Sequence, residues 1–130
     1  MPAFSRVRHF NFRNGQDELL SGSLLLPKQA PRGLVVSAHG FLEDRGKGGL
    51  PQIADALSRE GYAVFSFDQA GHGASDGKLE GMTLTRQVRD LHSAVEAARR
   101  RVTAYAEPGA ALKAAGPLPL FLVGRSLGAV

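Results

Sequence analysis

The stretch LPLFLVGRSLGAV, residues 118–130, decides the fold of this chain. Its first six residues are apolar and predict a last short strand, Leu118–Val123, that leads into Gly124. The next five, Gly124–Gly128, have the G-x-S-x-G spacing of a nucleophilic serine on a sharp turn between a strand and a helix. Glycine two residues before and after the serine lets strand and helix approach closely without a Cβ clash. The alternative is an ordinary turn in which Ser126 caps a helix.

Further apolar runs lie upstream of this stretch. LVVSAHG (Leu34–Gly40) and YAVFSFD (Tyr62–Asp68) are short and almost continuously apolar. Such runs are typical of strands in a parallel sheet that is covered on both faces. Nearer the N-terminus, Phe4–Phe12 and Leu19–Leu26 predict two more strands, with a hairpin turn at Asn14-Gly15 after the first.

Between the later strands, apolar residues recur at helical spacing. The first such segment is Leu50–Leu57, which Gly61 closes. The second has an apolar stripe over Leu84–Val102, and Thr83 is placed to cap its start. The alternation of strands and helices predicts an α/β fold, with a mostly parallel sheet and helices on both of its faces.

In such sheets, functional groups gather beyond the carboxyl ends of the strands. Three loops reach that edge here: HGFLEDRGKGG, DQAGHGASDG and GRSLGA. In acyl transfer, backbone N–H groups stabilise the negative oxygen of the tetrahedral intermediate. The expected donors are the N–H groups of Phe41, in the first loop, and of Leu127, directly after the serine. His39 is expected to be a structural histidine, hydrogen-bonded within its own loop.

The motifs HGF, FSFDQAGHGASDG and VGRSLGA, in this order and spacing, resemble the α/β-hydrolase superfamily. Residues 67–91, FDQAGHGASDGKLEGMTLTRQVRDL, are most similar to the branch of serine aminopeptidase-like hydrolases, monoacylglycerol lipase-like enzymes and cinnamoyl (feruloyl) esterases. The resemblance extends from about Phe12 to Val130 and covers the first half of that family's domain. Arg125 departs from the family, which often has histidine at this position.

The resemblance implies a role for each motif. Ser126 is implied to be the nucleophile, and Phe41 and Leu127 the oxyanion-hole donors. Asp68 and the glycines of Gly71–Gly73 are implied to be structural, holding the loop after the fourth strand. The implied activity is that of a serine hydrolase that cleaves a small-molecule carboxylic ester through an acyl-enzyme.

The triad of this fold runs in the order Ser, Asp or Glu, His. Residues 127–130 contain neither partner, and a serine hydroxyl is a weak nucleophile without an adjacent base. Residues 1–130 are therefore expected to be the N-terminal portion of a single α/β-hydrolase domain, truncated after the nucleophile elbow and inactive alone. The alternatives are an inactive fragment or remnant, a peptidase or amidase of the same superfamily, and a variant in which His39 or His72 acts as the base.

Composition excludes several other classes. The net charge of +4 is mild, and the basic residues lack the aromatic interleaving of a nucleic-acid-binding surface. The absence of cysteine excludes disulfides and thiolate metal sites. No apolar run approaches the roughly 20 residues that span a bilayer, and no signal peptide is recognised, so a cytoplasmic location is expected. No cofactor is expected, because Gly40–Gly48 lacks the spacing of a phosphate-binding loop. No metal is expected, because His39, His72, Asp44, Asp68 and Asp76 show no recognised ligand spacing. The oligomeric state is left open.

Overall fold

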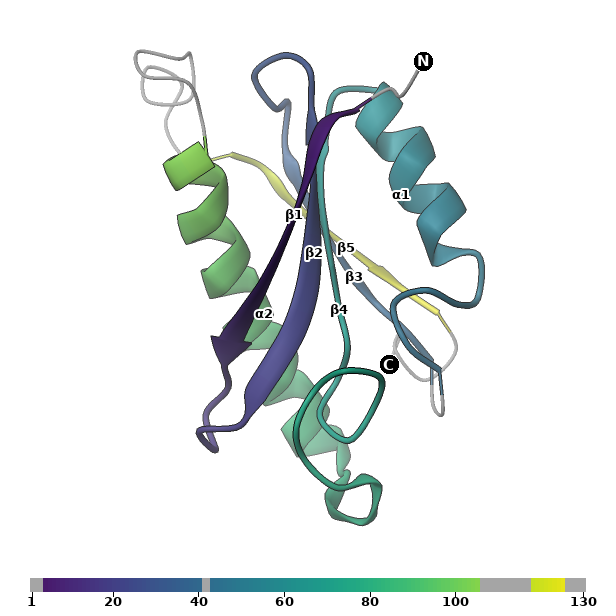
Figure 1. The fold of residues 1–130 in the computed structure, drawn as a ribbon, viewed down its shortest axis with the longest axis vertical. Helices are drawn as coiled ribbons and strands as arrows, with labels where there is room; N and C mark the ends of the chain where they lie inside the picture. The colour runs from purple at the N-terminus through teal and green to yellow at the C-terminus, as the bar shows by residue number, and fades with distance from the viewer. Residues whose placement is uncertain (1–3, 41–42, 106–117, 126–130) are drawn as a thin grey trace.

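A computed structural model of the protein describes residues 4–40, 43–105 and 118–125. The strands in these ranges form one sheet of five strands in the order β1-β2-β4-β3-β5 (Figure 1). Their bounds are β1 (Phe4–Arg13), β2 (Leu19–Pro27), β3 (Leu34–Ala38), β4 (Ala63–Phe67) and β5 (Leu120–Gly124). β2 pairs antiparallel with β1 and β4, whereas β3 pairs parallel with β4 and β5. Four strands thus share one direction and β2 opposes them, which confirms the mostly parallel α/β sheet.

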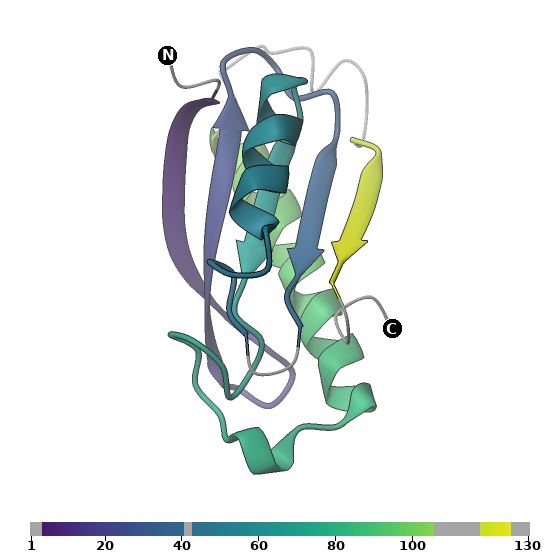
Figure 2. The same ribbon diagram turned by 90° about the vertical axis from the view of Figure 1, so that its right-hand side faces the viewer.

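Among the residues that the structure describes, two α-helices cover the sheet, one on each face (Figures 1 and 2). They are α1 (Leu50–Arg59) and α2 (Leu84–Tyr105), and a short 3-10 turn, η1 (Leu79–Gly81), precedes α2. Within the described ranges, neither of these helices is long and apolar enough to cross a membrane. The predicted covering of both faces is confirmed.

The helix ends follow the predicted local chemistry. Gly61 comes just after the last residues of α1 and adopts a φ of +96°, a left-handed conformation that glycine reaches without strain. At the start of α2, the hydroxyl oxygen of Thr83 accepts the backbone N–H of Arg86 at 3.1 Å. This bond satisfies one of the N–H groups that a helix start leaves without an intrahelical partner.

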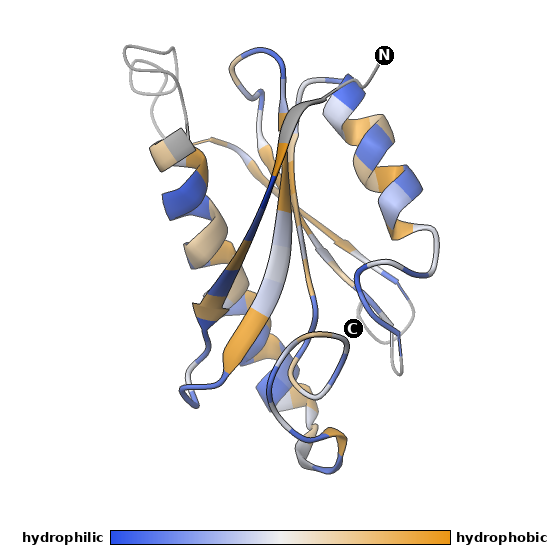
Figure 3. Ribbon diagram, viewed as in Figure 1, coloured by the Kyte–Doolittle hydropathy of each residue, from blue (hydrophilic) through white to orange (hydrophobic). Residues whose placement is uncertain are grey.

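The core has two parts because side chains alternate across the sheet. Along β3, Leu34, Val36 and Ala38 pack on the α2 face, whereas Val35 packs on the α1 face. Figure 3 shows the apolar stretches of the central strands between the two amphipathic helices. All residues of β3 and β4 are buried, as expected for strands that are covered on both sides.

The apolar stripe predicted along α2 is wrong in its first two turns. Leu84 and Val88 are 53% and 56% exposed. The inner face there carries polar side chains, because Gln87 contacts the amide of Gln69 and Asp90 lies beneath the β1–β2 turn. From the middle of the helix onward the inner face is apolar, and its buried residues are Ala94, Ala97, Ala98 and Val102.

Phe65 of β4 fixes the spacing of the α2 face. Its ring stacks on Phe10 of β1, with ring centroids 4.9 Å apart and planes 12° from parallel. Gly22 of β2 lies opposite Phe10 in the sheet, and a Cβ added there would collide with the Phe65 ring. The absent side chain therefore makes room for an aromatic ring over the middle of β2.

We expect Gly22→Ala to lower the free energy of unfolding by about 1–3 kcal/mol, because the methyl group would displace the Phe65 ring. Gly15→Ala is the matched control, since a Cβ at Gly15 has no neighbouring atom within 4 Å. Urea unfolding of both variants measures the difference. Equal midpoints for the two variants would contradict this account of the aromatic packing.

Candidate active site

The carboxyl ends of β3, β4 and β5 lie at one edge of the sheet (Figure 2). His39 and Gly40 follow β3, Asp68 follows β4 and Arg125 follows β5. The loop after β3 contacts the loop after β4 through Arg45 and Asp68, and the loop after β5 through Glu43 and Arg125. The predicted meeting of the loops is therefore confirmed for the residues that the structure describes.

Three predicted site residues lie outside the described part of the chain: Phe41, Ser126 and Leu127. Their roles as oxyanion donors and nucleophile stay predictions. The residues bonded to two of them are described, because Gly40 precedes Phe41 and Arg125 precedes Ser126. The backbone N–H of Arg125 donates to the carbonyl oxygen of Ala38 at 3.2 Å. This bond continues the pairing of β3 with β5 up to the residue before the predicted nucleophile.

His39 is fully buried, and both of its ring nitrogens have partners. Nδ1 lies 2.7 Å from the carbonyl oxygen of Gly40, and Nε2 lies 2.9 Å from the backbone nitrogen of Gln69. Because a backbone N–H can only donate, Nε2 accepts and the proton of the neutral ring is on Nδ1. Burial lowers the pKa of His39, against the opposing effect of its bond to Gly40. The predicted structural role is confirmed, and neither nitrogen is left for a catalytic base.

The Gln69 side chain links the loop after β4 to the loop after β3 and to α2. The side-chain amide of Gln69 donates to the carbonyl oxygen of His39 at 2.7 Å. Its amide oxygen accepts from Gln87 of α2 at 2.8 Å. The ring of His72 lies 4.9 Å from the ring of His39, with its Nδ1 3.1 Å from the carbonyl oxygen of Ala70. Gln69 thus connects the loop after β3 to α2.

A buried ion pair joins the loops after β3 and β4. The side chain of Asp68 is 4% exposed, and its Oδ2 lies 2.6 Å from Nη1 of Arg45. Oδ1 accepts the backbone N–H of Arg45 at 2.9 Å, and Oδ2 also accepts that of Ala74 at 2.9 Å. Gly73 adopts a φ of +49° and has no room for a Cβ beside this carboxylate. The structural role that the resemblance implied for Asp68 is supported by these bonds.

Arg45 also reaches the antiparallel strand β2. Its Nε donates to the hydroxyl of Ser23 at 2.9 Å, and its Nη1 to the carbonyl oxygen of Ser21 at 3.2 Å. The role of Arg45 could not be predicted from the sequence. Its partners lie 22 to 24 residues away along the chain, and nothing in its own loop indicates them.

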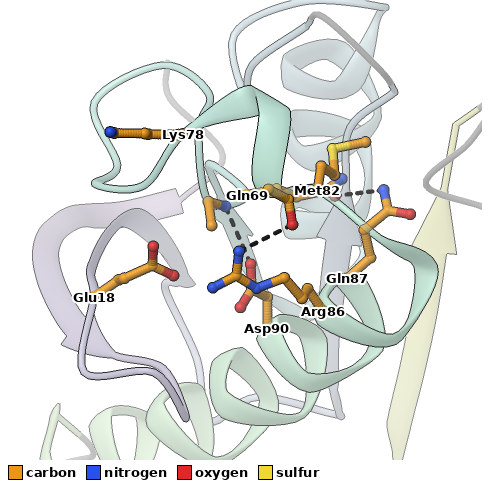
Figure 4. Close-up of a pocket in the computed structure, with 9 residues that line it drawn as sticks. Glu18, Gln69, Lys78, Met82, Arg86, Gln87 and Asp90 are labelled. Atoms are coloured by element: carbon orange, nitrogen blue, oxygen red, sulfur yellow. Dashed lines mark hydrogen bonds between the residues drawn. The ribbon is translucent and has the colours of Figure 1, made fainter.

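A small hollow lies beside this edge, between η1 and the first turns of α2 (Figure 4). Asp90 is buried there. Its Oδ1 accepts from the amide of Asn14 at 2.9 Å and its Oδ2 from the N–H of Ala70 at 3.1 Å. Burial raises the pKa of Asp90, although both hydrogen bonds oppose the shift. The hollow has room for about one water molecule, so it is not a substrate pocket.

The residues in the described ranges include no group of three or more His, Asp or Glu side chains that could hold a metal ion. The carboxyl edge of the described sheet holds backbone N–H and carbonyl groups in fixed hydrogen bonds. The acidic and basic groups at its centre, Asp68 and Arg45, satisfy each other.

We expect Arg45→Met to lower the free energy of unfolding by about 3 kcal/mol, because it leaves the buried Asp68 carboxylate without its cation. Arg59→Met is the matched control. It breaks an exposed ion pair with Asp55 on α1, and such pairs contribute about 0–1 kcal/mol. Chemical unfolding of both variants measures the change. Similar decreases in the free energy of unfolding would show that the Arg45–Asp68 pair contributes no more than an exposed ion pair.

We expect the His39 ring to remain neutral, with its proton on Nδ1, until the pH falls below 6.5. Because the pKa of His39 is lower in the folded protein than in the unfolded chain, its contribution to the free energy of unfolding is fully present above pH 6.5. The contribution declines as the pH drops from 6.5 through the lower folded pKa. Ring ¹⁵N chemical shifts, followed by NMR as a function of pH, report both the tautomer and the pKa. Protonation at or above pH 6.5 would be the contrary result.

Comparison with known proteins assigns a family to this arrangement. A family profile described as "Serine aminopeptidase, S33" matches residues 29–130. The chain is 34% identical over 102 residues to a monoacylglycerol lipase of Mycolicibacterium smegmatis, covering 78% of this chain and 31% of the relative. It is also 34% identical over 104 residues to a monoglyceride lipase homolog of Monkeypox virus, covering 79% of this chain and 32% of that one. The chain thus spans about a third of the length of these curated relatives.

Solved structures agree with this fold. An esterase of Pyrococcus furiosus superposes with a TM-score of 0.73 at 22% identity, over 97% of this chain and 44% of the esterase. Est1E of Butyrivibrio proteoclasticus, solved with ferulic acid, gives a TM-score of 0.71 at 22% identity, over 90% of this chain and 43% of Est1E. At these identities the likeness establishes the fold. The family profile matches most of this chain, residues 29–130, and shows that the chain belongs to the serine aminopeptidase S33 family of the α/β-hydrolase superfamily.

Proposed function

We propose that this chain carries the nucleophile and the oxyanion hole of a serine hydrolase that cleaves a small-molecule carboxylic ester. Ser126 is the nucleophile, and the backbone N–H groups of Phe41 and Leu127 hold the oxyanion. Residues 1–130 form the N-terminal portion of a single hydrolase domain in the cytoplasm. The catalytic acid and histidine come from sequence outside these residues.

One observation carries this proposal: the residues before Phe41 and before Ser126 are brought together at the carboxyl edge of the sheet. Gly40 follows β3, and Arg125 hydrogen-bonds to the last residue of the same strand. An oxyanion hole needs donors from these two loops about 3 Å from the developing negative oxygen. Family membership supports the same assignment, because G-x-S-x-G stands at the end of β5.

The proposed reaction has two steps. The Ser126 hydroxyl attacks the ester carbonyl and gives its proton to the histidine, and the carbonyl oxygen becomes an oxyanion that accepts hydrogen bonds from Phe41 and Leu127. When this tetrahedral intermediate breaks down, the alcohol leaves with the proton that the histidine held, and Ser126 remains acylated. Water then attacks the acyl-enzyme, again with the histidine as base, and releases the acid and the free serine. Loss of one oxyanion donor in such sites lowers kcat by about 10²–10³-fold.

An ester is preferred to an amide because of the relatives. The names of two relatives refer to a monoacylglycerol lipase and to a monoglyceride lipase homolog, and monoacylglycerols are esters, whereas the family description refers to an aminopeptidase. A p-nitrophenyl ester and a p-nitroanilide with the same short acyl group compare the two directly. We expect faster turnover of the ester, and a preference for the anilide would identify a peptidase or amidase instead.

The nucleophile is tested by covalent labelling. We expect the product of the complete reading frame that contains residues 1–130 to react with a fluorophosphonate probe. Ser126→Ala should abolish labelling and lower ester hydrolysis by about 10⁶-fold, the order found when such a nucleophile is removed. Ser93→Ala is the matched control, because Ser93 is a serine of α2 whose hydroxyl donates to the carbonyl oxygen of Arg89 in its own helix.

The origin of the acid and the base is tested with residues 1–130 alone. We expect this chain not to react with the probe, because an unactivated serine is a weak nucleophile. Labelling of Ser126 in the isolated chain would show that its base lies within these residues. Full labelling of the Ser126→Ala variant of the complete product would overturn the assignment of the nucleophile.

A further inference from the structure

One carboxylate contacts both loops that flank the proposed oxyanion hole. Oε1 of Glu43 accepts the backbone N–H of Gly40 at 3.0 Å. Its Oε2 lies 3.3 Å from Nη2 of Arg125. The backbone N–H of Glu43 also donates to the carbonyl oxygen of Gly40 at 3.1 Å, so the turn that carries the carboxylate is itself closed. Glu43 thus connects the end of β3 with the end of β5.

The side chain of Arg125 is held in this position by its surroundings. It passes over Gly48, which has a φ of +67°. A Cβ on Gly48 would collide with the Arg125 side chain and would lie 3.1 Å from Oε2 of Glu43. The backbone of Arg125 is fixed as well, by its bond to Ala38. Glycine at position 48 therefore makes the room that the ion pair occupies.

These contacts act on the two residues that precede the proposed site. Gly40 is bonded to Phe41, and Arg125 is bonded to Ser126. We propose that Glu43 is a positioning residue, whose carboxylate sets the distance between the Phe41 donor and the Ser126 turn through Gly40 and Arg125. This inference rests on the proposed function of Ser126 and Phe41. It adds Glu43, Arg125 and Gly48 as a unit that tunes the site without touching substrate.

The expected effect is on the rate of the chemical step. The pair is too exposed to contribute much to stability, since the side chains of Arg125 and Glu43 are 46% and 21% exposed. Misplacement of a catalytic group by a fraction of an ångström, however, is costly for reaction geometry. We expect Glu43→Gln and Arg125→Gln each to lower kcat by about tenfold, with KM nearly unchanged.

A double-mutant cycle in the product of the complete reading frame separates a shared role from two independent ones. If one unit is broken by either change, the double variant Glu43→Gln/Arg125→Gln loses no more than the single variants. If the loss of kcat in the double variant equals the product of the losses in the two single variants, the proposal is overturned, because Arg125 then acts on Ser126 without Glu43. Unchanged kcat in both single variants would overturn it as well.

Gly48 and Gly49 offer a matched pair that alters neither Glu43 nor Arg125. Both have positive φ, at +67° and +77°, so alanine is strained to a similar degree at each. Only the Cβ at position 48 meets Arg125, whereas a Cβ at position 49 has no atom within 4 Å. We expect Gly48→Ala to lower kcat as the pair variants do, and Gly49→Ala to leave it unchanged. Equal effects would attribute the loss to backbone strain and overturn the proposal.

Amide hydrogen exchange at Gly40 tests the unit without any turnover. We expect faster exchange in Glu43→Ala, which removes the acceptor, and also in Arg125→Gln, which releases the carboxylate from its second anchor. Unaltered exchange at Gly40 in Arg125→Gln would overturn the proposal whatever the kinetics show. Ser126→Ala is measured in parallel, because activity that survives this change refutes the proposed function and leaves the exchange result to decide on Glu43.

Discussion

The buried carboxylate of Asp68 is the constraint on which the carboxyl edge of the sheet depends. Its side chain is 4% exposed, so its charge must be met by protein groups rather than by water. The backbone of Arg45 and Ala74 and the guanidinium of Arg45 meet it. To provide these donors, the loop after β3 folds over the end of β4, and the loop after β4 turns back through Gly73. The two loops are therefore one structural unit.

A second buried carboxylate, Asp90 of α2, fixes the same edge from the helix. It binds Asn14 in the β1–β2 turn and Ala70 in the loop after β4. Glu43 differs from both acids, because it is partly exposed and its partners are one N–H and one exposed guanidinium. Asp68 and Asp90 thus set the fold of the edge, whereas Glu43 can adjust it with little effect on stability. The two structural acids, Asp68 and Asp90, are buried, whereas the proposed positioning acid, Glu43, is partly exposed.

Local features of the fold could be predicted from the sequence, because their causes are local. The buried strands, the left-handed Gly61 and the Thr83 cap each depend on a few neighbouring residues. The long-range contacts of the site could not be predicted, because Arg45, Asp90 and Glu43 each have a partner 20 to 82 positions away, and these contacts depend on the sheet order. The prediction of an apolar inner face at the start of α2 was wrong for the same reason. Polar partners on distant loops, not hydrophobic periodicity, decide which side of that helix faces inward.

The locked state of His39 limits what these residues can contribute to the proposed reaction. Both ring nitrogens of His39 are hydrogen-bonded to backbone groups, so this side chain orients its loop and has no nitrogen left to take a proton from the serine. The described edge is therefore suited to orientation and to electrostatic stabilisation, which need rigidity and fixed dipoles. Proton transfer needs a group with an available nitrogen or oxygen within reach of the serine. In the proposed enzyme, orientation by this edge and proton transfer by the catalytic base are therefore tasks of different residues.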